Sequence, residues 1–234
     1  MKSKNVFLTI LFAFLIAGCS QSLWIKDDFD SIKQNIDTVS VIFPQVNYYC
    51  KGDENINKAG YSLEVSKKIN EVLKDIIESG KFAGKSAKVF YDSSFVNNWL
   101  RDYKSGKLKS YKRLSSFFEK ASDGKKIFSP ESELKNSISK IDSKYYLIVT
   151  GMAFQTDFSN KNQDVQQRES FKLFFDSPMD YEIQWDGLQL EIALVETGTN
   201  EVLWYNFNGW KDSRYNPRNK EDINTLCTKL LTAE

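Results

Sequence analysis

The chain has 234 residues, 41% of them hydrophobic and 14% aromatic, and it carries 32 basic and 31 acidic side chains. This apolar content is enough for a folded core and argues against a largely disordered chain, while the balanced charge gives no reason to expect a nucleic-acid-binding protein. Histidine is absent, which excludes histidine-dependent catalytic triads and His-containing zinc sites.

The first nineteen residues have the pattern of a secretory signal peptide. Two lysines precede an apolar run over 6–17, which is too short to cross a bilayer as a helix. The run ends in the letters IAGC, and this ending resembles the lipobox of bacterial lipoproteins, in which an aliphatic and two small residues precede a cysteine. The resemblance implies a signal peptide over 1–18 and lipid on the thiol of Cys19. The alternative is an ordinary signal peptide cleaved after a small residue, with Cys19 incidental.

The expected lipid indicates where the mature chain works. No later stretch has the length and apolar content of a membrane helix, so the lipid on Cys19 would be the anchor. A single acyl chain binds a membrane only marginally, whereas bacterial lipoproteins with such an ending carry two or three, palmitate among them. Ser20, rather than aspartate, follows the cysteine. In Gram-negative envelopes that resemblance implies the outer membrane, facing the periplasm.

Two further cysteines, Cys50 and Cys227, remain in a compartment that favours oxidation. A disulfide between them would tie the start of the domain to its last helix. In the chain-entropy model, a loop of that length stabilises by roughly 4–5 kcal/mol. The alternative is a pair of separate buried thiols, which behave as small hydrophobic side chains.

After a lipidated tether over 19–37, we expect a single α/β domain over 38–234. Composition and periodicity predict the following elements in chain order: a strand at 39–43, a helix at 60–79, a strand at 87–91, mostly helical pieces within 93–142, strands at 145–154, 188–195 and 202–207, and a terminal helix with an apolar face from Ile223 to Leu231. Pro44 indicates an edge position or an early strand end, Gly80 a helix stop, and Gly151 a bulge.

The connections predict how the strands pair. A helix between the first two strands permits a parallel crossover, whereas turn residues at 197–200 join the last two strands as an antiparallel hairpin. The expected fold is therefore α/β (α+β), a single mixed sheet with helices packed on it and a terminal helix after the hairpin.

Four stretches resemble a group of envelope proteins. They are VSVIFP at 39–44, SGKF at 79–82, YYLIVTG at 145–151 and LEIALVETGTNEVLW at 190–204. The group includes the curli secretion lipoprotein, the lipoprotein activators of penicillin-binding proteins, and the N-terminal domain of the Tol system's propeller protein. The resemblance covers most of 38–231, and its motifs are structural rather than catalytic. It implies the fold above and leaves the role open, since one fold hosts several functions.

Two segments, expected as insertions at about 93–142 and 156–181, depart from the shared pattern. In the first, Asp92 or Ser93 is expected to cap a helix, Leu108 to Phe118 to form a second helical face, and Ser129-Pro130 to open a third helix. This segment is basic over 101–126, which suits anionic lipid head groups or an acidic partner, or else is a solvated helix face.

The second segment bears on an export role, because secretion-channel relatives build a membrane barrel from inserted hairpins. Spanning strands need roughly 9–11 residues of alternating pattern. Here Pro178 and Asp180 interrupt a brief alternation, and 160–167 is strongly polar. The segment therefore disfavours a pore.

The sequence predicts no catalytic, cofactor-binding or metal-ligating residue. It has no nucleophile elbow, dinucleotide-binding glycine pattern or phosphate-binding loop. Asp53, Asn55, Asn57 and Glu64 match several calcium-loop spacings, but Lys58 stands where that loop needs glycine. Carboxylate pairs alone support glycan hydrolysis in some enzymes, yet scattered acids identify no such site.

We therefore expect a lipid-anchored cell-envelope protein with a non-enzymatic α/β domain that binds a protein partner, acting as an assembly or regulatory factor. The exposed aromatic side chains of the two departing segments are the expected docking residues. The first alternative is an oligomeric secretion or export component, and the second is a carboxylate-dependent glycan-active enzyme. Homo-oligomerisation and the identity of the partner stay open at this point.

Overall fold

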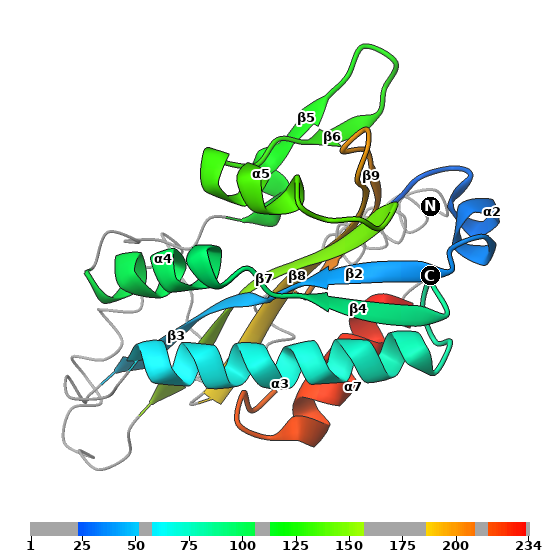
Figure 1. Ribbon diagram of the computed structural model, residues 1–234. Coiled ribbons are helices and arrows are strands. Elements are labelled where there is room, and N and C mark those ends of the chain that lie inside the picture. Colours follow the sequence, from blue (N-terminus) through cyan, green and yellow to red (C-terminus); the bar gives the residue numbers. More distant parts are fainter. Residues whose placement is uncertain (1–22, 52–57, 106–112, 157–185, 209–214, 233–234) are drawn as a thin grey trace, which may run out of the picture.

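The computed structural model describes residues 23–51, 58–105, 113–156, 186–208 and 215–232. Its strands are β1 (Trp24–Ile25), β2 (Thr38–Ile42), β3 (Gln45–Lys51), β4 (Ser86–Phe90), β5 (Phe118–Lys120), β6 (Lys126–Phe128), β7 (Tyr145–Thr156), β8 (Asp186–Glu196) and β9 (Val202–Phe207). Its helices are α2 (Phe29–Gln34), α3 (Lys58–Glu78), α4 (Ser93–Lys104), the 3-10 turn η1 (Leu114–Phe117), α5 (Ser132–Ile138) and α7 (Lys220–Thr232). Figure 1 shows a mixed sheet with helices packed on it and a C-terminal helix, which confirms the predicted fold class.

The described part of the main sheet holds seven strands in the order β1-β9-β8-β7-β2-β4, with β3 also paired to β7. β2 runs parallel to both β4 and β7, and β7, β8 and β9 are antiparallel neighbours. β2 and β3 both follow β7 in parallel, interrupted at Phe43 and Pro44. Pro44 thus marks an early strand end, as predicted, because proline lacks the N–H that a ladder needs.

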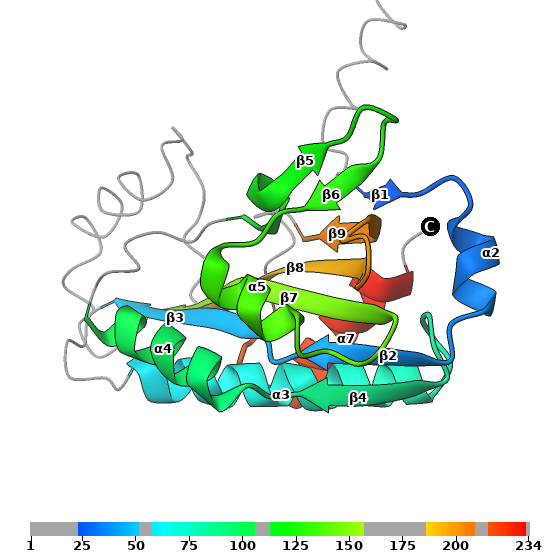
Figure 2. The same ribbon diagram turned by 45° about the horizontal axis from the view of Figure 1, so that its top comes forward.

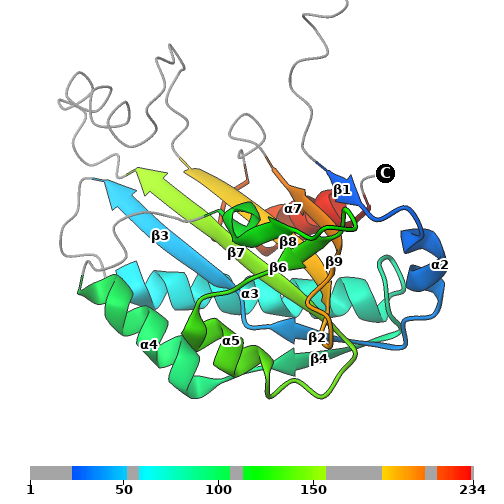
Figure 3. The ribbon, with the colours of Figure 1, turned by 90° about the horizontal axis from the view of Figure 1, so that it is seen from above.

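One face of the sheet is covered by α3 and α7, which lie behind the sheet in Figure 3. Alternating β8 residues point to this face and are fully buried: Leu188, Leu190, Ile192 and Leu194. The long helix α3 supplies the opposing apolar stripe, and Gly80 ends it with a φ of 72°. A period-2 strand against a period-3.6 helix is the arrangement that the sequence predicted.

The opposite face has a cover of short pieces, namely α5, η1 and the β5–β6 hairpin, which lie in front of the sheet in Figure 3. They bury a second apolar cluster made of Ile42, Leu114, Phe128, Ile138, Ile141, Tyr146, Ile148, Ala193, Val195, Val202 and Tyr205. The described residues therefore form a core on each side of the sheet, and a smaller third cluster of Phe43, Val96 and Trp99 lies under α4.

The folded part begins earlier than expected. β1 and α2 lie within 19–37, the predicted tether, and β1 pairs antiparallel with β9 through Trp24↔Tyr205 and Ile25↔Trp204. Phe29 of α2 is buried in the helix-side core. A two-residue strand has too little pattern to detect from sequence, which explains the difference.

The predicted helical face from Leu108 to Phe118 is wrong in its described part, where η1 leads directly into β5. β5 and β6 are joined by a turn in which Gly124 has a φ of 84°, and Ala121 donates its N–H to the carbonyl of Lys125. The Asp-Gly pair before β6 is a hairpin signal that outweighs the apolar spacing.

Gly151 forms no bulge, since β7 and β8 keep their register through Gly151↔Leu190. A Cβ at this position would lie 2.3 Å from the backbone oxygen of Gln189. Glycine is therefore needed for close approach of two strands rather than for a bulge. The insertion expected at 156–181, on which the export alternative depends, lies outside the described residues except for Thr156.

Candidate functional site

The residues singled out from the sequence fall mainly at the margin of the described structure. Cys19 lies four positions before Leu23, where the described chain begins. Cys227 is fully buried on the inner face of α7, and burial raises the pKa of its thiol to about 12. The side chain of Cys50 is outside the described residues, so the Cys50–Cys227 disulfide stays a prediction.

The aromatic residues expected to be exposed in the first insertion are largely internal. α4 begins at Asp92, whose carboxylate accepts the N–H groups of Ser94 and Phe95. Phe95 and Trp99 are both buried. Trp99 donates its indole N–H to Asn47 of β3 at 3.1 Å. The docking role predicted for this helix is therefore wrong for these two buried side chains, and Trp99 instead holds α4 against β3.

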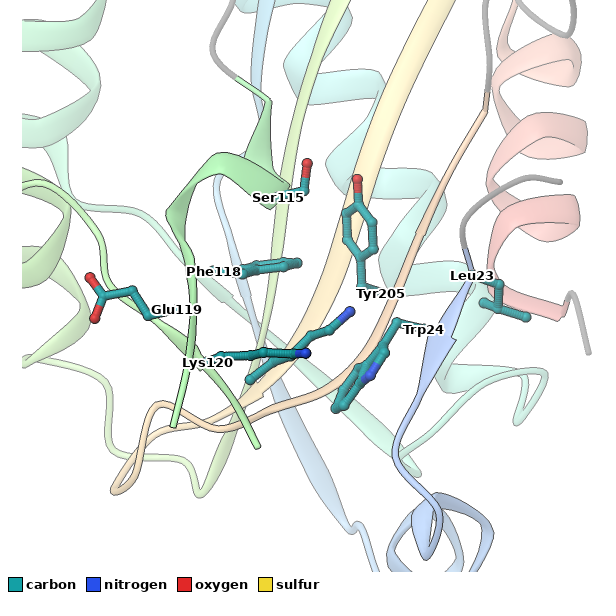
Figure 4. A pocket seen from close by; sticks show the side chains of 8 residues that line it. Leu23, Trp24, Ser115, Phe118, Glu119, Lys120 and Tyr205 are labelled. Carbon is teal, nitrogen blue, oxygen red and sulfur yellow. The ribbon is translucent and has the colours of Figure 1, made fainter. Parts of the chain in front are cut away.

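A pocket lies at the β1 end of the sheet, under the β5–β6 hairpin. It has a volume of about 290 Å³. Its lining combines aromatic, cationic and polar side chains: Leu23, Trp24, Ser115, Phe118, Glu119, Lys120, Lys126 and Tyr205 (Figure 4). These residues come from four separate parts of the chain. Because the pocket lies under the β5–β6 hairpin, we call it the hairpin pocket.

Strand pairing and ring packing position the walls of the hairpin pocket. β1 sets Trp24 directly opposite Tyr205 of β9. The ring of Phe118 meets that of Tyr205 edge-on, with centroids 5.1 Å apart. The ammonium of Lys126 lies 4.8 Å from the centroid of the Trp24 indole, a cation–π contact. The pocket is thus built from rigid rings with a cation across them.

A buried carboxylate supports the floor of the pocket. Glu191 of β8 accepts the Tyr205 hydroxyl at 2.9 Å and the backbone N–H of Ser115 at 3.3 Å. Burial and the charge of Glu191 raise the pKa of Tyr205. The phenol is therefore neutral at physiological pH and fixed in orientation by its hydrogen bond.

Two lysines give the pocket its charge. Lys120 and Lys126 are directly opposite each other across β5 and β6. Burial and the charge of Lys120 lower the pKa of Lys126. Within the described part of the chain, neither ammonium forms an ion pair with an acid. Strand alternation turns Glu119 away from Lys120, as Figure 4 shows.

Nearby lysines, by contrast, are neutralised. Lys26 lies 3.2 Å from Glu201, and Lys125 lies 2.9 Å from Asp123. The positive charge facing the hairpin pocket therefore belongs to Lys120 and Lys126. Both come from the basic segment 101–126 that the sequence had singled out.

The other end of the sheet is the exposed outer edge of β4. Val89 and Tyr91 are 43% and 51% exposed, and with Ile25 they are the exposed large hydrophobic residues of the described structure. No described strand pairs with the outer side of β4, which ends the sheet order. An edge strand with apolar side chains presents unpaired backbone groups to a partner strand.

β3 also has a free side, but the fold closes it. Ser62 and Ser66 of α3 are fully buried, and their hydroxyls accept the N–H groups of Tyr48 at 2.9 Å and Val46 at 3.3 Å. The Tyr103 hydroxyl of α4 donates to the carbonyl of Tyr48. The free edge of β4 therefore contrasts with the edge of β3, where side chains bond the backbone groups of Val46 and Tyr48.

Other chemistry has little structural support. Among the residues that the structure describes, no three cysteine, aspartate or glutamate side chains gather where they could hold a metal ion. Asp53, Asn55 and Asn57 lie outside those residues, and Glu64 pairs with Lys68 at 2.8 Å. No helix within the described ranges combines the length and apolar character needed to cross a membrane.

Comparisons with known proteins show no family for this chain. No protein-family model and no curated protein matches it. Among solved structures, the PelC dodecamer from Paraburkholderia phytofirmans is similar with a TM-score of 0.32 and 8% identity, over 84% of this chain and 86% of the other. The C-terminal domain of LpoB from Salmonella enterica gives 0.27 and 14%, over 77% and 90%. Both similarities are weak and assign no function to this chain.

Proposed function

We propose that this chain is a lipid-anchored cell-envelope protein whose non-enzymatic α/β domain binds a protein partner, as an assembly or regulatory factor. The lipobox-like ending at Cys19 supports the anchor. The observation that carries the proposal is the pairing of β1 with β9, which places the first sheet residue, Trp24, five positions after Cys19. Five residues span at most about 18 Å. The β1 end of the sheet is therefore held close to the membrane.

The β4 edge is the surface that we assign to the partner. It lies at the end of the sheet opposite β1, as Figure 2 shows, and so faces away from the anchor. Val89 and Tyr91 offer apolar side chains beside a strand edge that is free among the described residues. A partner segment in extended conformation would gain backbone hydrogen bonds from the edge and specificity from these side chains.

Replacing Cys19 tests the anchor. Cys19→Ala should abolish incorporation of labelled palmitate and release the protein from the membrane fraction, because the proposed attachment is the lipid on that thiol. Cys50→Ala is the matched control and should keep both the label and the membrane retention. Unchanged labelling of Cys19→Ala would contradict the anchor.

Photocrosslinking in cells tests the partner surface. Benzoylphenylalanine in place of Tyr91 should give an adduct with one protein, and the same probe in place of Lys74, on the exposed side of α3, should not. A second change, Val89→Asp, should abolish the Tyr91 adduct, because it places a charge on the apolar edge. Equal adducts at both probe positions, or an adduct that survives Val89→Asp, would contradict the assignment.

A further inference from the structure

We propose that the hairpin pocket binds the phosphate-bearing head group of an anionic phospholipid in the membrane that holds Cys19. This inference rests on the proposed lipid anchor and assigns a ligand to the β1 end of the sheet. Three features of the described residues carry it: an unneutralised pair of lysines, an aromatic wall, and the distance of the pocket from the anchor.

The lysine pair is the first feature. Like charges directly opposite on neighbouring strands repel each other, and Lys120 and Lys126 face each other across the β5–β6 hairpin. Lys120 and Lys126 have no acidic partner among the described residues, although Lys26 and Lys125 beside them do. The cation–π contact with Trp24 offsets part of this cost for Lys126, but no described acid neutralises either ammonium, and such a pair points to a function. A bound anion would neutralise both ammonium groups at once.

The walls indicate an anion that carries an apolar part. Trp24, Phe118 and Tyr205 line the same pocket as the two lysines. Tryptophan and tyrosine favour the level of lipid head groups, where an apolar ring and a polar tip are both satisfied. A phosphate would lie toward Lys120 and Lys126, and the glycerol and upper acyl carbons would lie along the rings. A small inorganic anion would leave this aromatic wall unused.

The short distance along the chain between the pocket and Cys19 indicates that the ligand comes from the membrane. Leu23 lines the pocket and lies four residues after Cys19, so the pocket is at most about 14 Å of chain from the lipidated thiol. Each polar layer of a bilayer is about 5–8 Å thick beyond the hydrocarbon core. The lysines of the hairpin therefore reach the plane of the phosphates without any change in the fold.

Amine labelling of the lipidated full-length protein tests the proposal. The protein is reconstituted into vesicles of phosphatidylcholine alone or of an equal mixture with phosphatidylglycerol, at one ionic strength, then pulsed with an acetylating reagent and analysed by mass spectrometry. Lys120 and Lys126 should be acetylated several-fold more slowly in the anionic vesicles. Lys88, at the β4 edge, should be acetylated at the same rate in both.

Two further experiments distinguish a lipid head group from a soluble anion, and test whether Lys120 and Lys126 act together. Inorganic phosphate added to phosphatidylcholine vesicles should not protect the lysines; equal protection would assign the site to a soluble anion and overturn the proposal. Lys126→Gln should remove the protection of Lys120, whereas Lys88→Gln should leave it intact. Protection of Lys120 that persists in Lys126→Gln would overturn the paired site.

Flotation of the same vesicles distinguishes this proposal from the anchor on which it rests. Protein that floats with both vesicle types but shows no lipid-dependent protection would overturn the head-group site alone. Protein that floats with neither would overturn the anchor and the head-group site together.

Discussion

The two ends of the sheet differ in the elements that cover them, in charge and in their distance along the chain from the proposed lipid anchor at Cys19. At one end, the β5–β6 hairpin covers the short strand β1, and aromatic rings and two lysines line the pocket between them. At the other end, β4 exposes Val89 and Tyr91 and has no described strand beyond it. One sheet thus has two ends of different character with a common core between them, and we propose that one end faces the membrane and the other a protein partner.

The bare edge of β4 is not explained by a general lack of cover in this fold. The free side of β3 is closed by the hydroxyls of Ser62 and Ser66 and by Tyr103. An uncovered apolar edge invites unwanted pairing, so proteins usually block it. That one edge is closed and the other is not supports a role for β4.

The largest expected effect separates the shared core from the exposed edge. Trp204 of β9 is buried and packs edge-on against Phe82, with ring centroids 5.1 Å apart. Trp204→Ala should lower the free energy of unfolding by about 3–5 kcal/mol. Tyr91 is half exposed and meets only the ring of Phe43 edge-on at 5.2 Å among the described aromatic pairs, so Tyr91→Ala should lower it by about 0.5–1.5 kcal/mol. Urea unfolding measures both, and similar losses would show that Tyr91 belongs to the core rather than to a free edge.

The next effect concerns the closed edge of β3. Ser62→Ala leaves the buried N–H of Tyr48 without its partner at 2.9 Å. We expect a loss of about 1–3 kcal/mol in the free energy of unfolding. The exposed Ser86 of β4 is the matched control, and Ser86→Ala should cost less than about 0.5 kcal/mol. Equal effects of the two serines would remove the contrast between the edges.

Asp92, between β4 and α4, makes the stability on this side of the sheet depend on pH. Its carboxylate lies 2.5 Å from the ammonium of Lys140, and that hydrogen bond lowers the pKa of Asp92 from 3.8 to about 2. Because the folded-state pKa is depressed, the stabilisation is fully present above about pH 4 and is lost as the pH falls towards 2.

Asp92→Asn isolates this charge, since asparagine still caps the helix. At pH 7 the variant should be less stable than the unmodified protein by about 1 kcal/mol, because it lacks a charge-assisted hydrogen bond. Urea unfolding at pH 7 and at about pH 2 measures the difference. The two proteins should converge at the lower pH, and a difference that stays constant would rule out the carboxylate as its cause.

The smallest expected effect has the opposite sign and lies at the β1 end. Lys120→Glu replaces a repulsive cross-strand pair with an attractive one, and should raise the free energy of unfolding by about 0.2–1 kcal/mol. The same change should weaken the response to anionic lipid. Lys88→Glu, which breaks an exposed ion pair with Asp142, should give no gain. A loss of stability in Lys120→Glu would show that repulsion between Lys120 and Lys126 does not destabilise the fold.

The sequence was most informative where one periodicity persists along an element. The apolar stripe of α3, the alternation of β8 and the turn before β9 predicted these elements to within a few residues. The cap at Asp92 was predicted by residue type alone. An element of ten residues or more, or a turn with characteristic residue types, is compatible with few other secondary structures.

The hairpin pocket could not be predicted in the same way. Its lysines were visible as part of a basic segment, but their pairing depends on a hairpin of two three-residue strands, in a region that the sequence pattern presented as helix. Trp24 was placed in a tether because two residues carry no periodicity. Its partner Tyr205 is far away along the chain, and only the β1–β9 register brings the two together.

The orientation of the sheet on the membrane tests the central claim most directly. Benzoylphenylalanine is placed at Glu119, beside the hairpin pocket, or at Tyr91, in lipidated protein reconstituted into vesicles of radiolabelled phosphatidylcholine. These zwitterionic vesicles make the result independent of any preference for anionic head groups. The account predicts lipid adducts from the probe at Glu119 and none from the probe at Tyr91. Equal labelling at both positions, or labelling only at Tyr91, would contradict it.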